Sequence, residues 1–317
     1  MFDVIAMGEL LMDMTPHGYS KQGQPLFEAN PGGAPANVLA LLAKHGKKTA
    51  FIGKVGHDRF GTELREVLER LGIDSSGLIT DPESNTTLAF VHLDEAGDRS
   101  FEFFRKPGAD TRLTAEELDH DLIRQAKIFH FGGLSLTKEP VRSATLAALQ
   151  IVRKLGGILV SFDPNYREDL WPSEEAARQE IQQVLAGVDV LKLSLEELQL
   201  LTSTKDLEEG TKRLFEQYGI ALILVTLGAE GSFYRTASKY GLVKGIQVKP
   251  IDTTGAGDAF FGAVLAQITE YEPLSSAFEP KAVRTILAYA NKVGAIVTTK
   301  MGAIPAMPDQ TIVHTFK

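Results

Sequence analysis

The residues best placed to do chemistry form one string near the C-terminal end of the chain, D-T-T-G-A-G-D-A-F over residues 252–260. Its small residues Gly255, Ala256 and Gly257 precede a helical pattern that runs to Ile268. Their backbone N–H groups can therefore surround an anion such as a phosphate at the positive end of a helix. Asp258 lies in the first turn of the predicted helix. If the chain contained only a lone Gly-x-Gly, a purely structural role would be favoured, with Asp258 as a helix cap and the glycines as a tight turn. The whole string is a much stronger signal of a functional site.

A second glycine-rich string, N-P-G-G-A-P-A-N over residues 30–37, also opens a predicted helix. Gly32 and Gly33 allow the backbone to approach a ligand closely, and Pro35 suits the first turn of a helix. Asn37 then faces back toward the glycine turn. The same pattern is equally typical of an ordinary helix start with an incidental asparagine, so the residues alone leave both interpretations open.

Two further strings each follow a predicted strand. Residues 194–197, S-L-E-E, fit a capping box, in which Ser194 caps the next helix and the Glu197 carboxylate reaches back to it. Residues 226–231, T-L-G-A-E-G, are typical of a turn. Ligands of open α/β sheets bind beyond the carboxyl ends of the strands, so both strings stand where a ligand is expected.

Short β-branched or apolar runs alternate with longer helical patterns along most of the chain. The predicted strands are 4–7, 49–55, 127–131, 158–163, 188–193 and 222–226, and the predicted helices are 36–44, 59–71, 115–124, 141–155 and 207–218. Such alternation is typical of βαβ units and of a parallel sheet that helices cover on both faces. We therefore expect an α/β fold with a doubly wound, mostly parallel sheet.

Two stretches interrupt this alternation. Residues 86–93 and 99–104, joined by 94–98, mix polar and apolar residues and predict an antiparallel hairpin. Together with the irregular stretch 15–30 they predict a small β lid, formed by about residues 14–30 and 86–106, that covers a ligand. Since no repeat, low-complexity segment or Pro/Gly linker divides the sequence, we expect one α/β domain with a lid over residues 1–317.

Composition limits the partners. The 317 residues include 41 acidic and 33 basic ones, a formal net charge of −8, so no overall positive field attracts nucleic acid or an anionic membrane surface. Cysteine is absent, which excludes disulfides and thiol chemistry and fits a reducing compartment. The first residues lack the pattern of a signal peptide, and no run of about 18 apolar residues predicts a membrane helix. We expect a cytoplasmic protein that binds neither nucleic acid nor membrane.

The two glycine-rich strings resemble the two signatures of the ribokinase-like (PfkB) carbohydrate kinases. The resemblance implies that Asp258 is the catalytic base, which takes the proton of a sugar hydroxyl as that hydroxyl attacks the γ-phosphate of ATP. It further implies that the backbone of Gly255, Ala256 and Gly257 forms an anion hole for the transferring phosphoryl group. The sequence contains no Walker A string, which disfavours the P-loop kinases.

The resemblance spans residues 8–308 and is greatest to the fructokinases of this family, which phosphorylate D-fructose to fructose 6-phosphate. It implies that the sugar is bound by Asp13, Gly32, Gly33, Asn37, Phe101, Arg105 and Arg167. Related 2-keto-3-deoxygluconate kinases use arginines at such positions to hold a carboxylate, so a kinase for that acid is the alternative. A sugar- or nucleotide-sensing protein that has lost catalysis is a third hypothesis.

The resemblance also implies ATP, Mg²⁺ and K⁺ as cofactors and a homodimer through the lid, where strand 99–104 would otherwise be exposed. Its nucleotide-binding positions are Lys192, Ser194, Thr226, Gly228, Gly231 and Asn291. Its metal positions are Glu197, which organises the water shell of Mg²⁺, and, around a monovalent cation, Asp252, Thr254, Val297, Lys300 and Gly302. Ser194 and Ala306 depart from the family pattern, since relatives carry asparagine and serine there.

Overall fold

The structure is a computed structural model and describes residues 1–93 and 99–316. Its main feature is a nine-stranded sheet in the order β13-β12-β11-β10-β9-β8-β1-β4-β5. The strands are β1 (Phe2–Met7), β4 (Thr49–Gly56), β5 (Asp74–Asp81), β8 (Ala126–Gly132), β9 (Leu159–Asp163), β10 (Val190–Ser194), β11 (Leu222–Thr226), β12 (Gly231–Thr236) and β13 (Tyr240–Lys244). Neighbours from β5 to β11 pair in parallel, whereas β12 and β13 pair antiparallel at one edge. The predicted α/β fold is confirmed.

Helices cover both faces of this sheet, which is why its central strands are mostly apolar on both faces. In β1, Val4 and Ala6 join one hydrophobic core and Ile5 and Met7 join the other. The first core takes α1 (Ala34–Lys44), α2 (Arg59–Arg70), α8 (Ala256–Ile268), α9 (Pro280–Val297) and α10 (Gln310–Thr315). The second takes α3 (His120–Ile123), α4 (Val141–Leu155), α5 (Glu174–Leu185), α6 (Leu195–Thr202) and α7 (Leu207–Tyr218). None of the helices within the described ranges has the length and apolar character needed to cross a membrane.

The direction of winding reverses at β1. The chain adds β4 and β5 on one side of β1, and later adds β8, β9, β10 and β11 on the other side. Loops that leave the carboxyl ends of β1 and β8 therefore diverge and open a crevice between them. In doubly wound sheets such a switch point is where ligands bind, so the topology locates the site.

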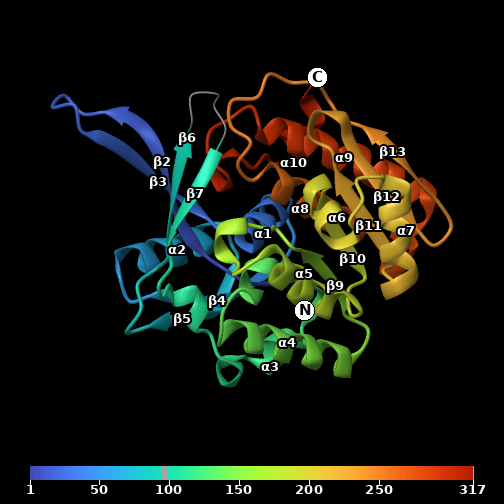
Figure 1. The fold of residues 1–317 in the computed structure, drawn as a ribbon, viewed down its shortest axis with the longest axis horizontal. Helices are drawn as coiled ribbons and strands as arrows, with labels where there is room; N and C mark the ends of the chain where they lie inside the picture. The colour runs from blue at the N-terminus through green and yellow to red at the C-terminus, as the bar shows by residue number, and fades with distance from the viewer. Residues whose placement is uncertain (94–98, 317) are drawn as a thin grey trace.

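A second sheet of four strands stands beside this crevice. It has the order β3-β2-β6-β7, from β2 (Leu11–Tyr19), β3 (Pro25–Gly32), β6 (Leu88–Leu93) and β7 (Arg99–Phe104). The predicted pairing of the last two strands is confirmed, while the predicted turn at residues 94–98 lies outside the described residues. In Figure 1 the β2–β3 hairpin, in blue, extends away from the body of the protein.

Two local predictions are wrong. Residues 15–30 are not irregular but form most of β2 and β3, where Pro16 and Gly18 disguise a strand that contains a register shift. The predicted helix 115–124 is broken in two. Thr114 and Glu117 form a capping box around a single 3₁₀ turn, η2 (Ala115–Glu117), and Asp119 then caps the separate helix α3.

Candidate active site

The switch-point edge holds a cavity of about 770 Å³. Its wall combines chain segments that lie far apart in sequence: the ends of β1 and β2, the start of α1, the loop after β9, the end of β10 and the start of α8. Of the predicted site residues it is lined by Asp13, Gly33, Asn37, Arg167, Lys192, Ser194, Glu197, Thr254, Gly255, Gly257 and Asp258. Most of the predicted sugar, phosphate and catalytic positions thus meet in one place.

Asp258 is held at the start of α8 by the small-residue turn. Gly255 has a φ of 74°, and a Cβ there would approach the Ala303 Cβ to 2.7 Å, so the turn requires glycine. The Asn37 side-chain amide donates to Asp258 Oδ2 at 2.8 Å and fixes the carboxylate. Burial raises the pKa of Asp258 to about 6, helped by the negative charge of Asp163, while the bond from Asn37 opposes the shift. A carboxyl with a pKa near neutrality is well suited to act as a general base.

Other groups in the cavity lining suit sugar hydroxyls. Burial and the nearby charge of Asp258 raise the pKa of Asp13 to about 7. Asn37 Oδ1 is buried and has no hydrogen-bond partner within residues 1–93 and 99–316, which makes it an acceptor for a ligand. Gly33 has a φ of 112°, and a Cβ there would lie 2.4 Å from the Glu9 carbonyl oxygen. Gly32 serves differently, since its missing Cβ leaves room for Asp13 Oδ2, which would be only 2.2 Å away.

A buried cation stands beside the small-residue turn. Lys192 Nζ pairs with Asp163 Oδ2 at 2.8 Å, and a Cβ on Gly257 would lie 3.3 Å from the same Nζ. Burial opposes the charged form, yet the negative charges of Asp163, Glu197 and Asp258 hold the pKa of Lys192 above that of an ordinary lysine. The side chain is therefore a permanent positive charge next to the backbone N–H groups at the start of α8.

Ser194 and Glu197 form the predicted capping box. The Ser194 hydroxyl accepts from the Glu197 N–H at 3.1 Å, and Glu197 Oε2 accepts from the Ser194 N–H at 2.6 Å. Glu197 Oε1 accepts from the Tyr166 N–H at 2.7 Å, which ties the loop after β9 to α6. Burial raises the pKa of Glu197, against the lowering effect of Lys192. The carboxylate also lines the cavity, so capping does not remove it from the site.

A smaller cavity of about 290 Å³ adjoins the first, and both are lined by Thr253 and Gly257. The predicted nucleotide positions Thr226, Gly228, Gly231 and Asn291 line it, together with Ala256. Asn291 Nδ2 donates to the carbonyl oxygens of Val243 at 3.0 Å and Lys244 at 3.3 Å, so this side chain shapes the wall. The two cavities meet at the start of α8, which places a phosphate-binding helix end between them.

Of the residues predicted around a monovalent cation, Thr254 lines the large cavity, whereas in the described ranges the other four line neither cavity. Asp252 Oδ1 accepts from the Thr254 N–H at 2.7 Å, and Asp252 Oδ2 accepts from the Gly302 N–H at 2.9 Å. The Val297 carbonyl accepts from the Lys300 N–H at 3.2 Å in the last turn after α9. Asp252, Thr254 and Gly302 therefore form one hydrogen-bonded cluster.

One predicted sugar contact, Arg105, lies elsewhere, and another, Phe101, stays a prediction. Arg105 is buried and is not among the described residues that line either cavity. Its guanidinium pairs with Asp110. The backbone of Phe101 belongs to β7, while its side chain lies outside what the structure describes. Sequence reasoning missed other lining residues, namely Glu9, Phe103, Leu134, Asn165, Tyr166, Glu168 and Asp169. Glu9 had a signal, an acidic residue directly after an apolar strand.

A crevice at the switch point of a doubly wound sheet, with a carboxylate suited to act as a general base, a helix start suited to a phosphate and a polar pocket suited to hydroxyls, is typical of a phosphotransferase that acts on a sugar hydroxyl. The chain belongs to the pfkB family of carbohydrate kinases, whose family model matches residues 1–310.

The relatives of this chain are similar over their whole length. Fructokinase-1 of Zea mays is 43% identical over 309 residues, which cover 97% of this chain and 95% of that protein. The structure of a fructokinase from Xylella fastidiosa with bound ATP matches with a TM-score of 0.91 and 32% identity, covering 99% of this chain and 98% of the other. A double mutant of the Vibrio cholerae O395 fructokinase, with fructose, ADP and a potassium ion bound, matches with a TM-score of 0.89 and 36% identity, covering 99% and 97%.

Proposed function

We propose that this carbohydrate kinase is a fructokinase, which transfers the γ-phosphoryl group of ATP to D-fructose and yields fructose 6-phosphate. The observation that carries the proposal is the Asn37–Asp258 hydrogen bond of 2.8 Å, since it joins the sugar-binding string to the catalytic string. Full-length similarity to fructokinases of plants and bacteria supports fructose as the sugar.

In the proposed mechanism Asp258 accepts the proton of the attacking sugar hydroxyl. The backbone of Gly255, Ala256 and Gly257, together with the Lys192 ammonium, stabilises negative charge on the phosphoryl group during in-line transfer. Asp13, the Gly33 backbone and Asn37 orient the sugar. The chain as a whole is acidic, but the groups that stabilise the phosphoryl charge lie within the site. The reaction therefore needs no overall positive field.

ATP would place its base in the smaller, mainly apolar cavity and its phosphates at the start of α8. Among the described residues no group of three or more His, Cys, Asp or Glu side chains is arranged to hold a metal directly. Mg²⁺ typically keeps several waters and binds through phosphates and one or two carboxylates, so the lone carboxylate of Glu197 fits an ion that arrives with the nucleotide. There it would neutralise charge on the phosphates.

For K⁺ we propose the oxygen atoms around Asp252, which suit a hard, weakly held cation.

We propose the lid sheet as the dimer interface. Tyr19, Phe27 and Phe104 are 77%, 40% and 57% exposed on it, and Phe90 packs between the last two rings. Apolar surface of this kind is typical of protein interfaces. We also propose one domain with a lid, located in the cytoplasm.

The alternative sugar, 2-keto-3-deoxygluconate, rests on Arg167, which lines the cavity. The charge of Arg167 lowers the pKa values of both Asp13 and Asp258, against burial, so two carboxylates already balance this guanidinium. A carboxylate on the substrate would add negative charge to a pocket already lined by the buried acids Glu9, Asp13, Glu197 and Asp258. This arrangement favours a neutral sugar over an acid.

The test is ADP release from MgATP with a panel of ketoses, aldoses and sugar acids. We expect D-fructose to have the highest kcat/KM. Turnover of another sugar in preference to fructose would replace the substrate and keep the kinase, whereas ADP release that no sugar stimulates would favour the sensing protein.

A further inference from the structure

Arg105 lies where the second sheet joins the body of the protein. It follows the last residue of β7, is 6% exposed and carries a charge that must be compensated in the interior. Its Nε donates to Asp110 Oδ2 at 2.7 Å, and its Nη1 donates to the Thr137 hydroxyl at 2.8 Å. Its Nη2 donates to the Leu134 carbonyl at 3.2 Å. One planar guanidinium thus holds three partners in fixed directions.

These contacts connect both lid strands to the body. Asp110 Oδ1 accepts from the Thr87 hydroxyl at 2.5 Å, and Thr87 immediately precedes β6. The Ala109 N–H donates to the Asn85 carbonyl at 2.8 Å, so the chain entering β6 and the chain leaving β7 run side by side. Gly108 permits this approach, since a Cβ there would lie 1.8 Å from Thr87 Oγ1.

The body partner of Arg105 is a wall of the sugar cavity. Leu134 belongs to the 3₁₀ turn η3 (Gly133–Leu136) and lines the large cavity. Phe103, two residues before Arg105 on β7, lines the same cavity from the lid side. Arg105 therefore sets the separation between the lid strand and the wall that faces it.

We propose that Arg105 is a positioning residue, which, through Asp110, Thr137 and the Leu134 carbonyl, holds the lid over the sugar without touching the sugar. This inference rests on the proposed kinase function. A lid held close to its wall excludes water, which otherwise competes with the sugar as phosphoryl acceptor. Loss of the linkage should weaken sugar binding and raise sugar-independent ATP hydrolysis, while ATP binding at the far cavity stays unchanged.

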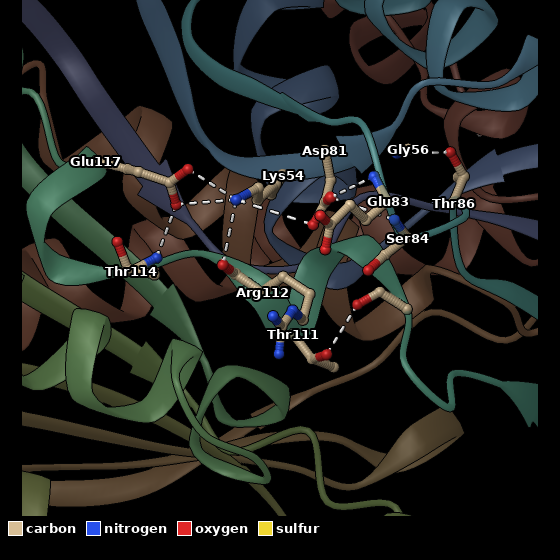
Figure 2. Close-up of polar contacts among 11 residues, drawn as sticks. Lys54, Gly56, Asp81, Glu83, Ser84, Thr86, Thr111, Arg112, Thr114 and Glu117 are labelled. Carbon is tan, nitrogen blue, oxygen red and sulfur yellow. Dashed lines mark hydrogen bonds and ion pairs between the residues drawn. The ribbon is translucent and has the colours of Figure 1, made fainter.

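A second buried cation provides a matched control. Lys54 on β4 donates to Glu117 at 2.7 and 3.0 Å and to the Arg112 carbonyl at 3.3 Å, and it lies 3.9 Å from Asp81 (Figure 2). These partners come from the end of β5 and from the 3₁₀ turns after the lid, and in the described ranges neither cavity is lined by any of the four residues. Lys54→Met removes a buried charge of similar kind and keeps the bonds of Arg105 to Thr137 and the Leu134 carbonyl, although the Arg112 carbonyl belongs to the same 3₁₀ turn as Asp110.

Three variants test the proposal. Arg105→Lys keeps the charge and loses the planar fork. Thr137→Val removes one of the bonds from the body and leaves the pair with Asp110 intact. The double variant Arg105→Met with Asp110→Leu removes both charges of the ion pair. Neither partner is left as an unpaired buried charge that could unfold the protein.

The experiment measures the KM for fructose, the KM for ATP, sugar-independent ADP release and the melting temperature. We expect Arg105→Lys and the double variant to raise the fructose KM and the ratio of sugar-independent to total ADP release at least about fivefold, with the ATP KM within about twofold. Thr137→Val should change the same two quantities by about twofold to threefold at a melting temperature near that of the wild type. Lys54→Met should lower the melting temperature and leave both quantities unchanged.

Wild-type values of fructose KM and ADP release in Thr137→Val and in the double variant would overturn the proposal. So would the same kinetic changes in Lys54→Met, because they would then follow from lost stability alone. If the wild type itself shows no sugar-stimulated ADP release, the proposed function fails, which is a different result.

Discussion

The Asn37–Asp258 hydrogen bond predicts how the activity depends on pH. Asn37 donates to a carboxylate oxygen at 2.8 Å and so favours the ionised form of Asp258, whose pKa is raised by burial to about 6. A hydrogen bond to a charged group contributes about 1.5 to 3 kcal/mol, and one pKa unit corresponds to about 1.4 kcal/mol. In Asn37→Leu, which keeps the apolar packing, the pKa of Asp258 should therefore rise by roughly one to two units.

The assay is the pH profile of kcat/KM for fructose, which reports the pKa of an essential base in the free enzyme. We expect the acid limb to move from about pH 6 in the wild type to roughly pH 7–8 in Asn37→Leu. The control is Asp13→Asn, which removes a second cavity carboxyl that titrates near neutrality and should keep a limb near or below that of the wild type. A limb that stays in place while kcat/KM falls would show that another group limits the reaction.

Three further predictions follow from the same site. Glu197→Gln should raise the Mg²⁺ concentration for half-maximal activity at least about threefold. It should also lower the free energy of unfolding by roughly 1 kcal/mol, because the new amide cannot accept from both backbone N–H groups. An unchanged Mg²⁺ curve with a lower melting temperature would leave Glu197 as a helix cap alone. Fructose should be turned over with a kcat/KM at least about tenfold above that for 2-keto-3-deoxygluconate, about 1.4 kcal/mol in transition-state binding, and a preference for the acid that disappears in Arg167→Ala would reverse this assignment. The folded-state pKa of Asp258 is raised above its ordinary value of 3.8 to about 6, so its ionisation destabilises the fold as pH rises through that window. Asp258→Asn should therefore gain about 1 to 1.5 kcal/mol over the wild type between about pH 5 and pH 8 in denaturant unfolding, and a constant difference across these pH values would contradict the assigned shift.

Local signals in the sequence were enough to predict six strands of the main sheet, though not its outer strands β5, β12 and β13, together with the β6–β7 hairpin, most helices and the two glycine-rich strings. These features depend on spacing along the chain: alternating apolar runs for the strands, and small residues before a helix for Gly255–Gly257. The capping box of Ser194 and Glu197 was predicted for the same reason and is confirmed.

Features that depend on distant contacts could not be predicted in this way. The pairing of Asn37 with Asp258 joins residues 221 positions apart, and no spacing rule reveals it. Arg105 illustrates the opposite error. The family resemblance implied a sugar contact, but the loop that follows β7 brings Asp110 back onto the guanidinium and turns the side chain inward. The strand character of residues 15–30 was hidden because Pro16 and Gly18 interrupt the pattern of a strand whose outer half is exposed.

The central claim, that Asp258 is the base of a sugar kinase, is tested most directly by fructose-dependent ADP release in Asp258→Asn, with fructose and ATP binding measured by calorimetry on the same protein. The side chain keeps its shape and its neighbour Asn37, and only the proton acceptor is lost. We predict that kcat falls at least about 100-fold while both dissociation constants stay within about threefold of wild type. A variant that retains kcat within about tenfold of wild type would contradict the assignment of Asp258 as the base.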